Sequence, residues 1–237
     1  MTQELVWDRE YRKSKLLTKE NKPQSDVVKF VKWLKKVVDT DASGGSREFE
    51  IDSSSLLDLG SGVGRNSFYF AEMGASVIGL EISKTAVDIS KDNAKNAGLD
   101  IKYEKQSIGE KFPCEDSSLD IVLDVTSSNS LTEIEREVYL SETNRVLKSG
   151  GYFFVKALCK DGDENAKFLI KNHAGIERDT YIMPELGVTE RVWTKEDFVS
   201  TYEKYFKILH LEKKTSYSRM NNRSYKRNFW ICYMQKV

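Results

Sequence analysis

The stretch LLDLGSGVGRNSFYFAEMGASVIGLEIS, residues 56–83, carries the pattern that decides the fold. A short apolar strand at 56–59 runs into three alternating glycines, and then come a helix and a second strand that ends on Glu81. Alternating glycines permit positive φ and let a ligand approach the bare backbone, while the start of the helix offers unpaired N–H groups. The stretch therefore predicts a βαβ unit with a nucleotide-type cradle.

The glycine spacing separates two classes of ligand. Glu81 lies about 20 residues after the glycines, where a carboxylate accepts hydrogen bonds from both ribose hydroxyls of an adenosine. The dinucleotide fingerprint G-x-G-x-x-G needs a small residue where Arg65 stands, and here the third glycine comes one place early. The spacing disfavours NAD, which remains the last alternative.

Three segments resemble the class I S-adenosylmethionine (SAM)-dependent methyltransferases. The pattern D-L-G-S-G-V-G-R-N at 58–66 resembles motif I of that family. QSIGEKFPCEDSSLDIVLDV at 106–125 resembles the approach to its fourth strand, and RVLKSGGYFFVKA at 145–157 resembles the link into its fifth. Within the family, D-L-G-x-G-x-G-R-N-S-x-Y is similar to the small-molecule branch that includes tellurite-resistance-type and type 11 enzymes.

The resemblance implies a Rossmann-like α/β fold: a mostly parallel seven-stranded sheet, helices on both faces and an antiparallel last strand. The alternation of strands and helices independently indicates a parallel sheet. Leu131, Ile134, Val138 and Leu147 predict the buried face of a helix over 131–147. We expect one domain over 1–237, with an N-terminal arm and helix (1–40), a loop (41–55), a cofactor-binding half (56–157), a substrate-shaping excursion (158–193) and a C-terminal helix and hairpin (194–237).

The cofactor implied by the resemblance is SAM, which leaves as S-adenosylhomocysteine (SAH). In this family the acid at Asp58 lies near the methionine end, and an N-terminal aromatic such as Tyr11 often closes over the ligand, with packing on the core as the alternative. Ser107 stands where members usually carry an acid for the adenine amino group, and a hydroxyl accepts more weakly. The expected cofactor contacts are Asp58, Gly60, Ser61, Gly62, Gly64, Asn66, Glu81, Ile82, Ser107, Ile108, Asp124, Val125 and Tyr11.

Methyl transfer from a sulfonium is an in-line displacement, so orientation supplies much of the catalysis. A base is needed only when the acceptor begins protonated. The titratable candidates are Asp124 at the end of the fourth strand, and His173 and Tyr181 in the excursion. Each also has a plain interpretation, as a loop acid or a surface residue, so the catalytic residue stays open.

The acceptor is predicted to be a small molecule or a peptide or protein side chain. Insertions at strand ends usually shape a substrate pocket, so we expect substrate contacts from Asn129, Tyr181, Arg219 and Arg223. TSSN at 126–129 stands where amino methyltransferases of DNA adenine or of glutamine side chains carry N/D-P-P-[YF]. Two alternatives remain: a non-catalytic SAM-binding partner subunit, and an RNA methyltransferase using two basic runs (Lys29, Lys32, Lys35 and Lys36; Arg219, Arg223, Lys226 and Arg227).

Composition limits the other classes of function. The chain has 237 residues, and its 37 basic and 37 acidic side chains balance, so no overall charge favours nucleic acid or a membrane surface. Three scattered cysteines and two histidines predict neither a disulfide framework nor a metal site. The N-terminus has no apolar signal region and no segment is long and apolar enough to span a bilayer, which predicts a cytoplasmic protein. The oligomeric state is not encoded in any recognisable pattern.

Overall fold

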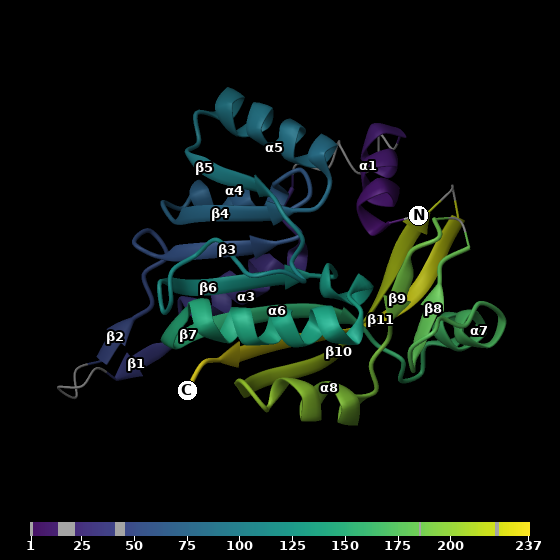
Figure 1. Cartoon of the computed structure of the whole chain (residues 1–237). Coiled ribbons are helices and arrows are strands. Elements are labelled where there is room, and N and C mark those ends of the chain that lie inside the picture. Colours follow the sequence, from purple (N-terminus) through teal and green to yellow (C-terminus); the bar gives the residue numbers. More distant parts are fainter. Residues whose placement is uncertain (1, 14–21, 41–45, 185, 221–222) are drawn as a thin grey trace.

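The computed structural model describes residues 2–13, 22–40, 46–184, 186–220 and 223–237, with the backbone alone at 38–40, 46–48, 218–220 and 223–224. A seven-stranded sheet forms its centre (Figure 1). Within this sheet, the five strands that come first in the chain run parallel to one another. The strand that comes last in the chain is antiparallel to both of its neighbours. The spatial order is β10 (Lys207–Met220), β11 (Arg223–Gln235), β7 (Leu147–Leu158), β6 (Leu119–Val125), β3 (Ser55–Leu59), β4 (Ser76–Glu81) and β5 (Ile101–Lys105).

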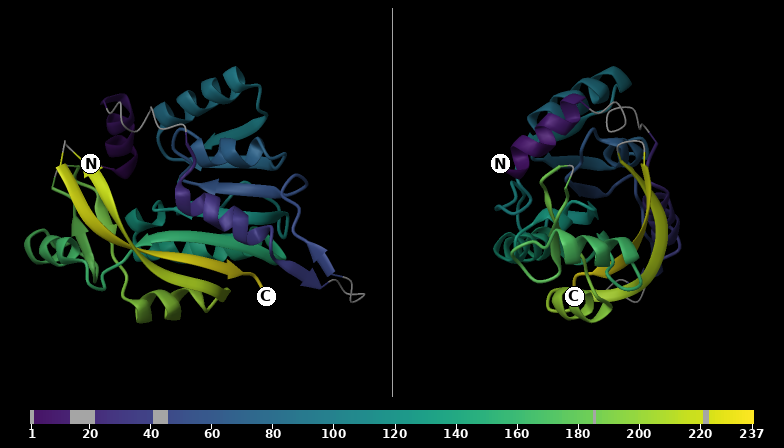
Figure 2. Two further views of the ribbon diagram at one scale, coloured as in Figure 1. Left: turned by 180° about the vertical axis from the view of Figure 1, so that it is seen from behind. Right: turned by 90° about the vertical axis from the view of Figure 1, so that its right-hand side faces the viewer.

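Helices cover both faces of the sheet, and each face has its own apolar core. One core takes side chains from α3 (Ser25–Leu34), α4 (Arg65–Ala71) and α5 (Lys84–Ala97). The other takes them from α6 (Glu133–Val146) and α8 (Lys195–Tyr202). Strands buried on both faces are expected to be apolar throughout, which explains the run of leucines before the glycines. Figure 2 shows α3 lying across the face opposite to α6.

Helix α1 (Gln3–Lys13) lies apart from these layers. It stands at the carboxyl ends of β3, β4 and β6, beyond the point where those strands stop (Figure 1). The short 3-10 turn η1 (Ser128–Ser130) follows β6 at the same edge. Carboxyl ends of parallel strands, where the strand order reverses, are the usual place for a ligand in α/β folds. This edge of the sheet is therefore the place to look for a site.

Three predicted segments differ in the structure. The excursion contains α7 (Glu164–Asn172) and a small antiparallel pair, β8 (Thr180–Ile182) and β9 (Thr189–Arg191). The predicted loop at 41–55 is wrong in part, because β2 (Ser46–Glu48) pairs with β1 (Val38–Thr40) across residues 41–45, which lie outside the description. The final hairpin is longer than predicted, because β10 and β11 continue to pair with each other beyond the last contact with β7.

The buried face predicted for the helix over 131–147 is wrong in part: Leu131 and Leu147 are buried and Val138 is half-buried, but Ile134 is not. Ile134 is 82% exposed, whereas Tyr139, Leu140 and Val146 are buried. The Tyr139 hydroxyl donates to Asp124 Oδ2 at 2.6 Å, which turns that face of the helix toward β6. A polar anchor thus shifts the helix away from the stripe that apolar spacing alone indicates.

Two further observations concern the described part of the chain. None of its helices is long and apolar enough to cross a membrane. The same residues contain no group of three His, Cys, Asp or Glu side chains arranged to hold a metal, and the three cysteines are free.

Candidate functional site

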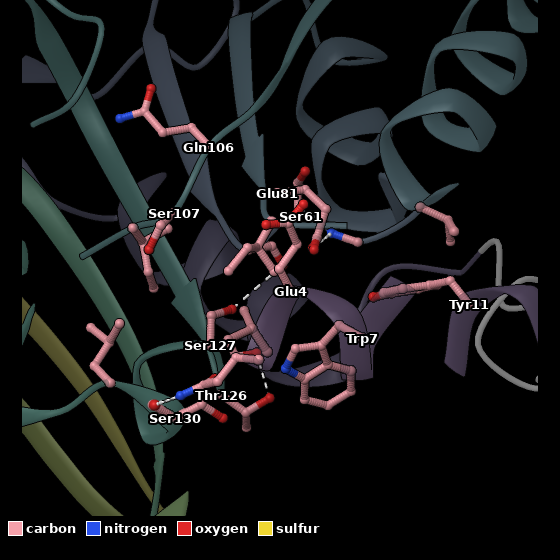
Figure 3. A pocket seen from close by; sticks show the side chains of 18 of the residues that line it. Glu4, Trp7, Tyr11, Ser61, Glu81, Gln106, Ser107, Thr126, Ser127 and Ser130 are labelled. Carbon is pink, nitrogen blue, oxygen red and sulfur yellow. Dashed lines mark hydrogen bonds between the residues drawn. The ribbon is translucent and has the colours of Figure 1, made fainter. Parts of the chain in front are cut away.

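A cavity of about 460 Å³ opens at the carboxyl ends of β3, β4 and β6, between those strands and α1 (Figure 3). Its volume lies within the usual range for sites that hold small molecules and cofactors. Its walls come from segments far apart in the sequence: Thr2, Gln3, Glu4, Trp7, Tyr11, Gln24, Gly60, Ser61, Gly62, Val63, Arg65, Asn66, Glu81, Ile82, Gln106, Ser107, Ile108, Glu110, Val125, Thr126, Ser127, Ser130, Leu131 and Glu135.

The three motif I glycines have different roles. All have positive φ, as expected for a tight turn. Gly62 faces the cavity, and a Cβ atom there would lie 2.7 Å from the Tyr11 hydroxyl. A Cβ atom at Gly64 would instead strike the ring and hydroxyl of Tyr103, and Gly64 does not line the cavity. The lack of a side chain at Gly64 serves the packing of the loop on β5, and a cofactor contact at Gly64 stays a prediction.

Glu81 ends β4 with its carboxylate at the cavity. One oxygen accepts from the Gly62 N–H at 2.9 Å and the other from the Ser83 N–H at 2.8 Å. Burial raises the pKa of Glu81 above its usual range, while these two N–H groups oppose the rise. A carboxylate has about four acceptor positions, so two remain for a ligand.

Asp58 lies beneath the cavity and does not line it. The side chain is 2% exposed, and Oδ2 accepts from the Ser67 hydroxyl at 2.6 Å. Burial raises the pKa of Asp58 to about 6, against the opposing effects of Ser67 and the Arg65 guanidinium. In this structure, Asp58 therefore lies behind the cavity wall. From this position its negative charge can act on a ligand in the cavity.

Two further residues follow the first glycine. The Ser61 side chain lines the cavity, and its buried hydroxyl has no hydrogen-bond partner among the described residues. Buried polar groups are normally satisfied, so an orphan hydroxyl at a cavity wall indicates a ligand or water partner. Asn66 also lines the cavity, and its side-chain oxygen accepts from the Gln24 N–H at 3.0 Å, at the start of α3.

The loop after β5 closes another side of the cavity. Ile82, Ser107 and Ile108 line it together, as the sequence suggested. The Ser107 hydroxyl already accepts from the Gly109 N–H at 3.1 Å, which ties the loop down. The Ser107 hydroxyl, which is a weak acceptor for an adenine amino group, thus already accepts one hydrogen bond from the protein.

Asp124 is buried with its carboxylate directed away from the cavity. Its Oδ1 accepts from the Ser127 N–H at 2.9 Å and the Ser128 N–H at 3.3 Å, while Tyr139 bonds to Oδ2. Burial raises its pKa, and it does not line the cavity. The oxygens of Asp124 shape the turn that follows β6, and its roles as a base and as a cofactor contact stay predictions.

Val125, which lines the cavity as expected, is followed by Thr126 and Ser127. The Ser127 hydroxyl donates to the Leu59 carbonyl at 2.8 Å and so joins the ends of β3 and β6. Asn129 does not line the cavity; its side-chain oxygen accepts from the Leu158 N–H at 3.1 Å. Contact of Asn129 with an acceptor stays a prediction, while Ser130 and Leu131 line the cavity.

The remaining candidates lie away from the cavity. His173 ends α7 and does not line the cavity. Tyr181 is fully buried, donates to Glu190 and accepts from Arg227 at 2.8 Å, so its hydroxyl is enclosed by the excursion and the hairpin. Burial raises its pKa, so its hydroxyl stays protonated at neutral pH. The structure thus places both residues away from the cavity, and their catalytic or substrate roles stay predictions; the side chains of Arg219 and Arg223 lie outside the description.

Helix α1 supplies the wall that the sequence indicated least. Tyr11 and Trp7 line the cavity, in agreement with their placement over a ligand, but Gln3 and Glu4 line it too (Figure 3). Arg65 also lines the cavity. Burial raises the pKa values of Asp58 and Tyr11, and the positive charge of Arg65 opposes this rise. No local pattern marks Gln3 or Glu4, because their position depends on how α1 docks.

Comparison with known proteins gives consistent matches. A family model described as "Methyltransferase domain" matches residues 57–155. The chain is 32% identical over 113 residues to a ubiquinone biosynthesis O-methyltransferase of Brucella anthropi, a match over 45% of this chain and 42% of that protein. It is 26% identical over 188 residues to the protein of the same name in Pelagibacter ubique, over 79% of this chain and 71% of that one. The chain thus spans less than half the length of the first relative.

Solved structures share the fold over more of the chain. A SAM-dependent methyltransferase of Methanosarcina mazei aligns with a TM-score of 0.69 and 21% identity, over 78% of this chain and 93% of that one. The 1,6-didemethyltoxoflavin-N1-methyltransferase of Burkholderia thailandensis, solved with 1,6-didemethyltoxoflavin and SAH, aligns with a TM-score of 0.65 and 15% identity, over 99% and 88%. Residues 57–155 thus match a methyltransferase domain, and the solved structures show that the chain shares the fold of SAM-dependent methyltransferases.

Proposed function

We propose that this protein transfers a methyl group from SAM to a small-molecule acceptor bound in the cavity beneath α1. The observation that carries the proposal is the pairing of two features at motif I. Glu81 has free acceptor positions, and the buried Ser61 hydroxyl has no partner among the described residues. Both residues line one cavity of about 460 Å³, a size that suits a nucleoside cofactor and a small acceptor.

The proposed cofactor contacts follow from the positions of the lining residues. Glu81 would accept from the ribose hydroxyls, and Ile82 and Ile108 would pack on the adenine. Ser61, Gly62 and Arg65 would hold the amino acid end, where the Arg65 guanidinium suits a carboxylate. Asp58 would act on the ligand's ammonium group through its charge. When bound, SAM supplies a methyl group on a positively charged sulfur.

The acceptor side of the cavity is proposed to lie between the end of β6 and α1. Thr126, Ser130 and Leu131 line this part from the end of β6, and Gln3 and Trp7 line it from α1. Figure 3 shows Trp7 near Thr126 and Ser130. Among the described lining residues, Arg65 is the one basic side chain, whereas Glu4, Glu81, Glu110 and Glu135 are acidic. If Arg65 holds the cofactor's carboxylate, no cation remains there for an anionic acceptor. We therefore propose an uncharged or cationic acceptor.

The lining residues also bear on the chemistry. Among the residues that the structure describes, the lining includes no His, Lys or Cys side chain, and its carboxylates are those of Glu4, Glu81, Glu110 and Glu135. An acceptor that is nucleophilic without losing a proton first, such as an amine or a heteroaromatic nitrogen, needs no base. For such an acceptor the protein has to align the reactants and exclude water, which orientation effects favour strongly. The proposal is therefore methylation at nitrogen in preference to a neutral hydroxyl.

The proposal is tested first with the cofactor and then with acceptors. Isothermal titration calorimetry of the protein with SAH should show one site, and NADH should not compete. SAH release from SAM should then be measured with a heteroaromatic amine, a catechol and a small carboxylic acid. Turnover with the amine and none with the carboxylic acid supports the proposal; SAH binding without turnover of any acceptor would favour a partner subunit without activity.

The RNA alternative receives no support from the basic hairpin. Arg227, one of its four basic residues, is 5% exposed and is bonded to Asp163 and Tyr181. A buried, paired guanidinium is not available to phosphates. Turnover of bulk tRNA that falls steeply with added salt would restore this alternative.

A further inference from the structure

Helix α1 forms a whole wall of the cavity and so controls what a ligand touches. Thr2, Gln3, Glu4, Trp7 and Tyr11 all line the space (Figure 3). The Tyr11 hydroxyl lies so close to motif I that a Cβ atom at Gly62 would be 2.7 Å from it. Both aromatic side chains can contact a ligand only while α1 stays docked against the ends of the strands.

Apolar packing holds α1 only weakly. Among the described residues of the helix, Val6 is buried and Leu5 is 58% exposed. An isolated helix of 11 residues is marginal in water. The docked position of α1 must therefore depend largely on polar contacts.

The strongest of these contacts converge on Asp8. Its Oδ1 accepts from the Thr85 N–H at 2.8 Å and from the Ser83 hydroxyl at 3.0 Å, both at the N-terminus of α5. Arg12 pairs with Asp8 Oδ2 at 2.6 Å and donates to the Thr85 hydroxyl at 3.2 Å. A carboxylate at a helix N-terminus satisfies an unpaired N–H and is favoured by the helix dipole. Asp8 thus acts as a second cap for α5, supplied by another helix.

The other polar contacts of α1 are weaker or more exposed. Glu4 pairs with Lys105 at 2.5 Å, but both side chains are nearly half exposed, and such pairs contribute little. The Arg9 guanidinium donates to the Leu186 carbonyl at 3.3 Å, and Gln3 donates to the Ser130 carbonyl.

Asp8 is also close to the proposed ribose acid. The residue that donates to Asp8 through its hydroxyl, Ser83, donates through its backbone N–H to Glu81 Oε1 at 2.8 Å. The docking of α1 and the orientation of Glu81 therefore share one residue. A substitution at Asp8 therefore affects the cavity in two ways: it alters the docking of α1, and it alters the hydrogen bonds of Ser83, which orients Glu81.

We propose that Asp8 is a positioning residue for ligand binding: it fastens α1 to the N-terminus of α5 and so holds Trp7 and Tyr11 over the ligand. This inference rests on the function proposed above, since it requires that SAM or SAH occupies the cavity. The Thr85 N–H holds the pKa of Asp8 below its usual range, which keeps the carboxylate charged at neutral pH.

The test compares Asp8→Ala, Asp8→Asn and the control Asp88→Asn in the full-length chain. Asp88 pairs with Lys84 on the exposed side of α5. Its variant therefore removes an acid near the N-terminus of α5, the helix to which Asp8 binds, and leaves α1 unchanged. Two quantities are measured: the Kd for SAH by calorimetry, and the hydrogen exchange of residues 3–13 by mass spectrometry. Thermal unfolding of each variant checks that the domain stays folded.

Asp8→Ala should raise the Kd for SAH about tenfold and speed exchange in 3–13, by analogy with the loss of a helix cap. Asp8→Asn should retain most of both properties, because asparagine is also a good capping acceptor. Asp88→Asn should match wild type. An Asp8→Ala protein that binds SAH as tightly as wild type, or that loses affinity with unchanged exchange in 3–13, overturns the inference alone. A wild-type protein that does not bind SAH overturns the proposed function and this inference with it.

Discussion

Two buried polar groups in this molecule look alike in the sequence and differ in the structure. The first is the motif I group, Asp58, Ser61 and Glu81, at the ends of β3 and β4. The second is the excursion cluster, Asp163, Tyr181, Glu190 and Arg227, between the excursion and the hairpin. In the motif I group, Ser61 lacks a partner among the described residues and Glu81 keeps free acceptor positions toward a cavity.

In the excursion cluster, the polar groups satisfy one another. Tyr181 bonds to Glu190 and Arg227, and Arg227 bonds to Asp163, which also caps α7 through the Ala166 N–H. A buried ion pair of this kind specifies how segments dock and is costly to break. The comparison teaches that burial and titratable chemistry do not identify a site; unused hydrogen-bonding capacity beside a cavity does.

The largest expected effect is on the stability provided by the excursion cluster. Arg227→Met should lower the free energy of unfolding by about 3 kcal/mol, because it leaves buried acids without their cation. Urea denaturation measures this change, and calorimetry should show an unchanged Kd for SAH. Lys226→Met, at an exposed neighbour, is the control and should change neither. A large loss of SAH affinity in the Arg227 variant would break the comparison, since it would place the cluster in the site.

Replacement of the proposed ribose acid should act on binding. Glu81→Gln should weaken SAH binding by about 1–3 kcal/mol, the usual cost of losing a charged hydrogen-bond partner. The control is Glu72→Gln, an exposed acid after α4. Equal SAH affinity for Glu81→Gln and wild type, measured by calorimetry, contradicts the assigned role.

The pH dependence of binding tests the electrostatic role of Asp58. Its pKa of about 6 lies above the usual value, so the folded protein holds this proton more tightly than the unfolded chain does. Protonation as the pH falls through 6 therefore relieves a cost to folding, but it removes the negative charge that attracts the ammonium group of SAH. SAH affinity should fall about threefold between pH 7.5 and 5.5.

Burial also raises the pKa of Glu81, so protonation of Glu81 contributes to the same fall in SAH affinity at low pH. The Asp58→Asn variant isolates the contribution of Asp58. It should bind SAH more weakly at pH 7.5 and show a shallower dependence on pH than wild type. Parallel pH profiles for the two proteins would show that the Asp58 charge does not reach the ligand.

The smallest expected effect is at Ser61. Ser61→Ala should weaken SAH binding by about 1 kcal/mol, the typical net contribution of one hydrogen bond. It should not lower the stability of the ligand-free protein, because the hydroxyl has no partner among the described residues to lose. Ser90→Ala is the matched control: its buried hydroxyl donates to the Val87 carbonyl at 2.9 Å, so it should lose stability and keep SAH affinity.

Local sequence signals predicted the backbone of the central unit well. The strand predicted at 56–59 is present as β3, and the second strand ends on Glu81 as predicted. Turn glycines, caps and buried strands depend on neighbours within a few residues, which the sequence displays directly. Prediction failed in part for α6, where a hydrogen bond between Tyr139 and Asp124 overrides the apolar stripe.

The fold and the cofactor cradle can be predicted from the sequence, because the order of strands, the glycine turn and the acid after the second strand are local features of one continuous stretch. Which polar groups are free to bind depends on the tertiary structure. Gly64 packs on Tyr103, Asp124 shapes a turn, Asn129 bonds to Leu158, and Asp8 caps a helix far along the chain. The reason is physical: whether a donor or acceptor is already satisfied depends on partners brought close by folding, and no local spacing encodes them.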